Sequence, residues 1–188
     1  MAPWCRVRCP ESCWLFCARR WRASVREAPV AGSSKREKIK MTPDEVASFL
    51  AANYKVQVAT VGKDGEPHLV TMFYALLDGK IAFTTYQKSQ KVLNLRRNPT
   101  MTCLVEDGVE YNELRGVALY GRGLVIEDPE PRSKVGMVVG SRMAGLPVPE
   151  MGAPIDPVVA EGIEQAISKR VLIVMEPDRV VSWDHRKA

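Results

Sequence analysis

Three Asp-Gly pairs constrain this chain most, because each marks a tight turn between apolar, β-branched segments. They are Asp64-Gly65, Asp78-Gly79 and Asp107-Gly108. Aspartate and glycine tolerate the positive backbone angles that short hairpin turns need. Segments joined by such a turn pair in antiparallel fashion. The sequence therefore predicts successive hairpins in a mostly antiparallel sheet.

Seven segments have the composition of strands, and four have the pattern of helices. The predicted strands are residues 56–61, 68–76, 80–86, 101–105, 111–127, 171–175 and 180–183. The predicted helices are residues 43–53, 90–97, 130–141 and a fourth that begins near Pro157. Thr42 and Glu45 form a capping box around Pro43 at the start of the first helix. Six or seven antiparallel strands with a few short helices predict a closed, mainly β architecture in one domain.

The positive charge of the chain is concentrated near its N-terminus. Residues 1–40 carry ten Lys or Arg and three acids, whereas the remainder carries 17 bases and 19 acids. A nearly neutral body argues against nucleic-acid binding. We expect residues 1–40 to be a separate basic leader, either disordered or upstream of a true start at Met41. Residues 41–188 are then the folded domain.

Cysteine is distributed in the same way. Four of the five cysteines lie between Cys5 and Cys17, and Cys103 alone lies in the body. The spacing of the four, interrupted by Pro10, is not typical of a zinc site, so no metal is expected. A body with one cysteine fits a reducing compartment, and we expect a cytoplasmic protein. No apolar run is long enough to span a membrane.

Residues 81–99, IAFTTYQKSQKVLNLRRNP, combine a strand, a polar corner and a short helix that Asn98-Pro99 ends. The first N–H groups of a helix are unpaired, and the helix dipole favours an anion there. Ser89 and Lys91 stand at this corner. We therefore expect them to bind a phosphate, as charge-assisted hydrogen bonds to phosphate are strong.

Four blocks of sequence resemble a known family. They are ATVGKDGEPHLVTMFY (59–74), DGKIAFTTYQKSQKVLNLRRNP (78–99), YNELRGVALYGRG (111–123) and RVVSWDHRK (179–187). They are similar to the flavin-binding split-barrel proteins of the pyridoxamine phosphate oxidase class. Within that class the chain most resembles the deazaflavin branch, which uses coenzyme F420. The C-terminal arginine and histidine arrangement of true pyridoxamine phosphate oxidases is missing, so oxidation of vitamin B6 is not expected.

The resemblance implies a six-stranded antiparallel split β-barrel with a Greek key, of the FMN-binding split-barrel type. It implies a homodimer with a cofactor in each cleft between subunits. Nine residues would contact that cofactor. Val70, Thr71 and Met72 would line the ring, Thr84, Thr85 and Tyr86 would face the ribityl and phosphate region, and Lys88, Ser89 and Lys91 would hold the phosphate.

The implied activity is transfer of a hydride from reduced F420 to an unsaturated organic substrate. The alternatives are an FMN-dependent reductase or oxidase and a non-catalytic flavin or deazaflavin carrier. The sequence shows no nucleophile or general-acid constellation, so no catalytic residue is assigned. This agrees with a cofactor enzyme, in which the ring carries the hydride.

Some positions have two interpretations. Arg96 and Arg97 could bind the glutamyl tail of F420 or simply complete a helix. His68 could lie at the edge of the cofactor or be a hydrogen-bonded strand residue. The Pro-rich segment 145–157 could shape a substrate cleft or cover a sheet edge.

Overall fold

The computed structural model describes residues 34–151 and 157–188. Predictions for residues 1–33 and 152–156 lie outside the described residues. The strands are β1 (Lys55–Val61), β2 (Pro67–Phe73), β3 (Ala75–Leu77), β4 (Lys80–Tyr86), β5 (Thr100–Asp107), β6 (Arg115–Ile126) and β7 (Arg170–Asp184). The helices are α2 (Ser34–Lys38), α3 (Pro43–Ala52), α4 (Gln90–Arg97), α5 (Pro129–Ala144) and α6 (Pro157–Ile167), with 3₁₀ turns η1 (Tyr111–Glu113) and η2 (His185–Lys187).

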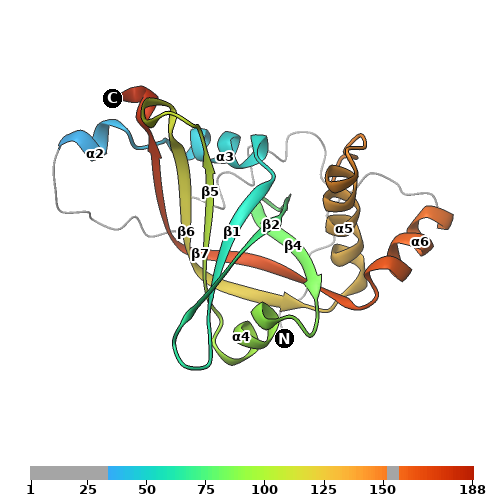
Figure 1. The fold of residues 1–188 in the computed structure, drawn as a ribbon. Coiled ribbons are helices and arrows are strands. Elements are labelled where there is room, and N and C mark those ends of the chain that lie inside the picture. Colours follow the sequence, from blue (N-terminus) through green and yellow to red (C-terminus); the bar gives the residue numbers. More distant parts are fainter. Residues whose placement is uncertain (1–33, 152–156) are drawn as a thin grey trace, which may run out of the picture.

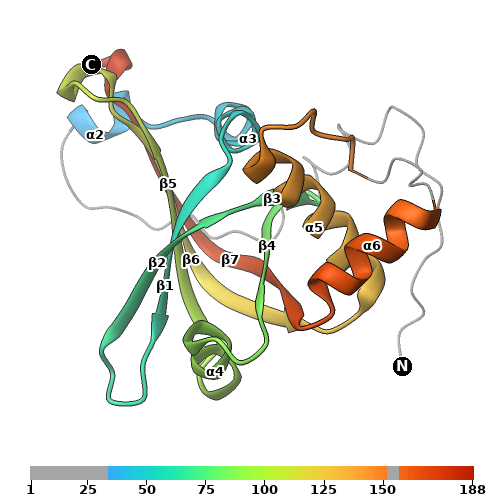
Figure 2. The same ribbon diagram turned by 45° about the vertical axis from the view of Figure 1, so that its right-hand side comes forward.

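The strands form one sheet in the order β2-β1-β5-β6-β7-β4-β3, and every pair is antiparallel. Figure 1 shows the sheet curling into a half-barrel, with α3 at one end, α4 at the other and α5 and α6 to one side. Figure 2 shows the same arrangement from a second direction. The predicted mainly β, antiparallel split-barrel fold is confirmed, with seven strands where the family resemblance implied six.

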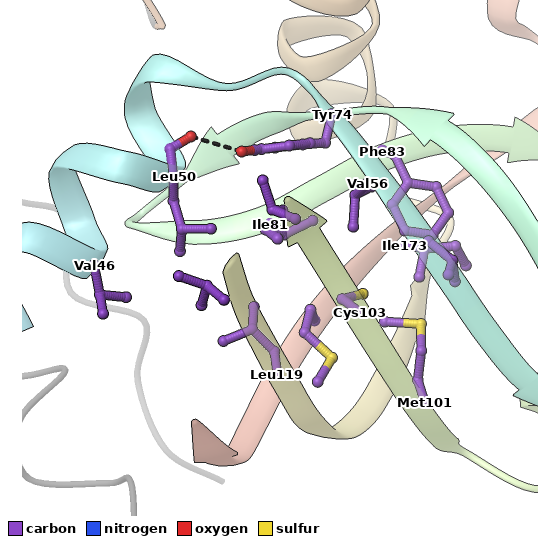
Figure 3. Close-up of a cluster of buried hydrophobic side chains, with 14 of the residues drawn as sticks. Val46, Leu50, Val56, Tyr74, Ile81, Phe83, Met101, Cys103, Leu119 and Ile173 are labelled. Atoms are coloured by element: carbon purple, nitrogen blue, oxygen red, sulfur yellow. Dashed lines mark hydrogen bonds between the residues drawn. The ribbon is translucent and has the colours of Figure 1, made fainter. Parts of the chain in front are cut away.

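The predicted strand 68–76 is divided into β2 and β3 at Tyr74. The Tyr74 N–H donates to the carbonyl of Tyr54 at 2.9 Å, and its hydroxyl donates to the carbonyl of Leu50 at 2.7 Å. The first bond continues the β1–β2 pairing by one residue, and the second holds the ring, which is completely buried (Figure 3). Burial raises the pKa of the Tyr74 hydroxyl well above its ordinary value. A buried hydroxyl needs a partner, and the Tyr74 hydroxyl finds one in Leu50 of α3 at the point where β2 ends.

The C-terminal part differs from prediction in the opposite way. The segments 171–175 and 180–183 form one strand, β7, because Pro177 pairs opposite Gly121 at a register shift in β6. A Cβ on Gly121 would lie 2.0 Å from the carbonyl oxygen of Glu176, so only glycine allows this approach. β6 begins at Arg115 and not at Tyr111, since residues 111–113 form the turn η1.

The main hydrophobic core fills the half-barrel. It includes Phe49 from α3 and Leu95 from α4. Figure 3 shows part of it, with Phe83, Cys103 and Ile173 from the strands. The Thr42–Glu45 capping box begins α3 as predicted. Burial raises the pKa of the Cys103 thiol to about 12, so this cysteine acts as a core residue.

A second core lies between α5 and the opposite face of β3, β4 and β7. It contains Ala82, Val135, Val139 and Leu172. Asp128 caps the helix through the Glu130 N–H. α5 extends to Ala144, beyond the predicted 141, and Gly145 ends it in the left-handed conformation with φ 67°.

Contacts with the folded domain begin before Met41, the predicted start of that domain. The Asp184 N–H donates to the carbonyl of Ile39 at 2.6 Å, and the Met41 N–H donates to Ser182 Oγ at 3.2 Å. These bonds tie residues 39–41 to the end of β7, on the opposite side of the molecule from α4 (Figure 1).

Candidate functional site

The predicted phosphate corner lies where β4 ends and α4 begins. Ser89 is the N-cap of α4, and its side chain makes no capping hydrogen bond. Val92 and Leu95 point into the main core and fix the inner side of the helix. The first N–H groups of α4, together with the side chain of Ser89, are therefore available at this end of the half-barrel.

Three side chains meet at this corner. Lys91 Nζ donates to Thr85 Oγ1 at 3.1 Å, and the hydroxyl groups of Thr85 and Ser89 are 3.3 Å apart. Thr85 is buried, whereas Ser89 and Lys91 are half-buried. We call Thr85, Ser89 and Lys91 the phosphate cluster. When Thr85 donates its proton to Ser89, the Ser89 hydroxyl and two Lys91 N–H groups can still donate to a ligand.

The phosphate cluster has the electrostatics of an anion site. No described carboxylate lies within ion-pair distance of Lys91. Burial lowers the pKa of the Lys91 ammonium because it loses water without gaining a negative partner. A half-buried cation with only a neutral partner is unfavourable for stability by itself. A phosphate bound here would supply the missing negative charge, so the donor set fits one.

Further cations lie beside the last residues of β4 and the turn that follows it, and two of them were missed from the sequence. Arg170 pairs with Tyr86 across β7 and β4, and its guanidinium lies 4.6 Å from the ring centroid of Tyr86. The carbonyl of Lys169 accepts the Gln87 N–H at 3.0 Å. Lys88 and Lys169 are exposed. We call Lys88, Lys169 and Arg170 the basic rim; none of them is ion-paired with a described residue.

The arginines at the end of α4 are already engaged. Arg96 forms an ion pair with Glu127 at 2.7 Å. Arg97 donates to the carbonyl of Val61 at 2.9 Å and to Asn94 Oδ1 at 3.2 Å. These contacts secure the C-terminal end of α4. They favour the interpretation in which both arginines complete the helix.

The strand residues expected to line the cofactor lie on different faces. Val70 and Met72 on β2 point inward and pack on the main core, whereas Thr71 is exposed on the opposite face. On β4, Thr85 faces inward, but Thr84 is buried on the face that α5 covers, where a Cβ on Gly136 would lie 3.9 Å from it. The structure thus brings Thr85, Ser89 and Lys91 together and separates Thr84 from them.

The two histidines lie apart. His68 on β2 pairs with Thr60, and its Nδ1 is buried without a hydrogen-bond partner among the described residues. His185 packs edge-on against Tyr111, with ring centroids 4.6 Å apart. The described residues contain no group of three or more His, Cys, Asp or Glu that could hold a metal. In the same part of the chain, no helix is both long and apolar enough to cross a membrane.

Comparison with solved structures places this geometry among known folds. A conserved hypothetical protein from Mycobacterium tuberculosis is 39% identical, with a TM-score of 0.72 over 82% of this chain and 92% of that chain. An FAD-binding protein from Mesorhizobium loti is 18% identical, with a TM-score of 0.56 over 76% and 94%. A heme storage protein from Vibrio cholerae is 16% identical, with a TM-score of 0.54 over 74% and 93%. The last two similarities concern the fold alone.

Sequence comparison assigns the family. No curated protein sequence matches the chain significantly. Residues 42–184, which include every described strand and the phosphate cluster, match the pyridoxamine 5'-phosphate oxidase family. That span covers well over half of the 188 residues. The chain belongs to the pyridoxamine 5'-phosphate oxidase family.

Proposed function

We propose that this protein is an oxidoreductase that transfers a hydride from reduced coenzyme F420 to an unsaturated organic substrate. The observation that carries the proposal is the half-buried Lys91 ammonium, which hydrogen-bonds to Thr85 beside the N-cap Ser89 and has no described anionic partner. Lys91 and Ser89 bind the cofactor phosphate, and Thr85 holds both side chains in place. The deazaflavin ring, when bound, supplies the hydride.

The basic rim supports F420 over FMN. A flavin mononucleotide ends at its phosphate, which the phosphate cluster alone can hold. F420 continues into a glutamyl tail and needs further cations. Lys88, Lys169 and Arg170 provide them next to Tyr86, which is 58% exposed. Carboxylates of the tail bind this rim through charge-assisted hydrogen bonds, and the guanidinium of Arg170 suits a carboxylate best.

The ring lies against the edge strand β2 and the end of β4 that carries the phosphate cluster, outside the main core that fills the half-barrel. Val70 and Met72 give it apolar contacts, and the backbone beside Thr71 and Thr84 gives it hydrogen-bond partners, since those two side chains face elsewhere. β2 is an edge strand, so its outer backbone groups are free to pair with a ligand. The chain's residues bind, orient and shield the ring; they do not supply an acid or a nucleophile.

A homodimer completes the site. No described helix packs on the outer face of β1, β5 and β6, which Figure 2 shows uncovered. Leu104, Ala118 and Val181 lie across this face in register, and Gln57 Oε1 is buried there without a described partner. A second copy of the chain buries the exposed parts of Leu104 and Val181 and closes each cleft.

FMN is the second candidate, because the phosphate cluster by itself fits a phosphate monoester equally well. The assay that separates F420, FMN and a carrier role is single-turnover oxidation of reduced F420 with a panel of substrates: enones, quinones and tetrapyrroles. We expect F420 absorbance to recover with at least one substrate class. Binding of F420 without oxidation by any of them would instead identify a carrier, and turnover only with reduced FMN would reassign the cofactor.

A further inference from the structure

Asn94 lies in the middle of α4 and is completely buried. Its Nδ2 donates to Thr60 Oγ1 on β1 at 3.1 Å. Its Oδ1 accepts hydrogen bonds from Gln90 Nε2 at 2.8 Å and from Arg97 at 3.2 Å. The amide is therefore satisfied at both ends, and Thr60, itself 2% exposed, uses its hydroxyl in the same network. The Asn94–Thr60 pair is the buried centre of this network, whereas Gln90 and Arg97 are exposed.

A helix of eight residues is too short to be stable alone, so its contacts decide where it lies. Apolar contacts through Val92 and Leu95 bury surface but permit small rotations, because the hydrophobic effect is not directional. Hydrogen bonds to a buried amide have fixed geometry, and buried polar groups can specify a single arrangement. Asn94 imposes this geometry on β1 from the buried side of α4, and Arg97 adds a bond to the carbonyl of Val61 from the exposed side.

The placement of α4 matters for the phosphate cluster. Lys91 is three residues before Asn94, so the two side chains lie on neighbouring parts of one helix face. Lys91 reaches Thr85 on β4, whereas Asn94 reaches Thr60 on β1. β1 and β4 are separated by three strands in the sheet order. α4 thus bridges two distant strands, and each hydrogen bond constrains the other.

We propose that Asn94 and Thr60 are positioning residues for the cofactor phosphate: their hydrogen bond sets the rotation of α4 that brings Lys91 and Ser89 to Thr85. This inference rests on the proposed function in that the ligand is the cofactor phosphate. It predicts that binding can be lost while folding is retained.

The test uses Asn94→Leu alone and together with Thr60→Val in the full chain. Asn94→Leu leaves the Thr60 hydroxyl buried without a partner, so its melting temperature falls. The double variant removes both polar groups, so its melting temperature returns to near that of the wild type. We expect affinity for F420 to be at least fivefold weaker in both variants. Recovery of affinity together with stability in the double variant would reduce Asn94 to a structural role and overturn the proposal.

Two further variants separate positioning from general damage. Asn53→Leu removes a half-buried amide that donates to Phe49 in α3, at the other end of the half-barrel, and should leave affinity within twofold. In a Lys91→Ala/Ser89→Ala background, the Asn94→Leu/Thr60→Val pair should weaken binding by less than twofold, because its effect passes through those two side chains. Additive losses in that background would contradict the inference.

A measurement on the free protein keeps this test independent of the proposed function. Lysine side chains carrying ¹³C-methyl groups report each ammonium pKa by NMR titration. In the double variant the Lys91 ammonium leaves its half-buried position, so its pKa should rise toward the ordinary lysine value. Failure of F420 and FMN to bind the wild type would refute the proposed function, and the placement of Lys91 by Asn94 and Thr60 would still be tested by the pKa. An unchanged Lys91 pKa in the double variant would refute the inference that Asn94 and Thr60 position Lys91.

Discussion

Replacing Lys91 by alanine tests the phosphate cluster most sharply in a single side chain. The substitution removes one ammonium that can donate to a bound phosphate, and leaves Thr85 and Ser89 in place. A hydrogen bond to a charged group contributes about 1.5–3 kcal/mol, and each 1.4 kcal/mol changes affinity about tenfold. Lys91 is only half-buried, which places the expectation at the lower end. We therefore expect F420 to bind about tenfold more weakly or worse.

The same substitution should have the opposite effect on folding. The ammonium is half-buried and has no described anionic partner, so its removal relieves a desolvation cost in the cofactor-free protein. We expect the melting temperature of free Lys91→Ala to equal or exceed that of the wild type. Weaker binding together with equal or higher stability is the result expected for a site that holds a desolvated charge ready for its ligand.

Affinity is measured by equilibrium titration of apo protein, following F420 fluorescence, at two salt concentrations. Lys38→Ala is the matched control, because Lys38 is an exposed lysine on α2 at the other end of the molecule. The control should bind like the wild type. Unchanged affinity in a folded Lys91→Ala protein would refute the assignment of the phosphate to this corner.

Three other predictions follow from separate contacts. Arg170→Gln should lower the affinity for F420 at least fivefold more than the affinity for FMN, as titration of both cofactors will show. It should also make F420 affinity depend less on the number of glutamates in the tail. Leu104→Arg should convert the proposed dimer to a monomer in analytical ultracentrifugation, whereas Val109→Arg, at a position 89% exposed, should not. Arg186 lowers the pKa of the Asp184 carboxyl below 3.8, so the stability this contributes is complete above pH 3.8 and is lost as the pH falls through the lower value. Melting temperatures between pH 5 and pH 2 should therefore fall less steeply for Asp184→Asn than for the wild type.

Features encoded by neighbouring residues could be predicted from the sequence. The turn at Asp78-Gly79 has positive φ at both residues, as its composition indicated. The Thr42–Glu45 capping box and the end of α4 at Asn98 also depend on contacts within a short stretch of chain. The same holds for Ser89 and Lys91, since both lie on one short helix that directly follows β4.

Features that depend on long-range contacts could not be predicted. The break at Tyr74 follows from a hydrogen bond to Leu50, in the preceding helix α3. Arg170 joins the basic rim only because β7 pairs with β4, although the chain passes through β5, β6, α5 and α6 between the two strands. Asn94 has the pattern of a polar position on a surface helix, yet Thr60 of β1 covers it. The one available signal was the position of Asn94 between the inward-facing Val92 and Leu95. A polar residue there needs a buried hydrogen-bond partner.

The face of the sheet on which a strand residue lies also could not be predicted from the sequence. Thr84 and Thr85 are adjacent and chemically alike, and both are buried. Alternation puts one on the barrel interior and the other against α5, a helix that begins only at Pro129, after β5 and β6. Sequence pattern predicts that adjacent residues face opposite ways but does not say which face holds the ligand.

The central claim is that the corner between β4 and α4 holds the phosphate of F420, with the basic rim holding its tail. The most direct measurement is parallel titration of the apo protein with F420, FMN and hemin under identical conditions. We predict saturable binding of F420 at one site per chain, at least tenfold tighter than FMN, with no comparable binding of hemin. Tight binding of FMN or hemin without binding of F420 would contradict the account.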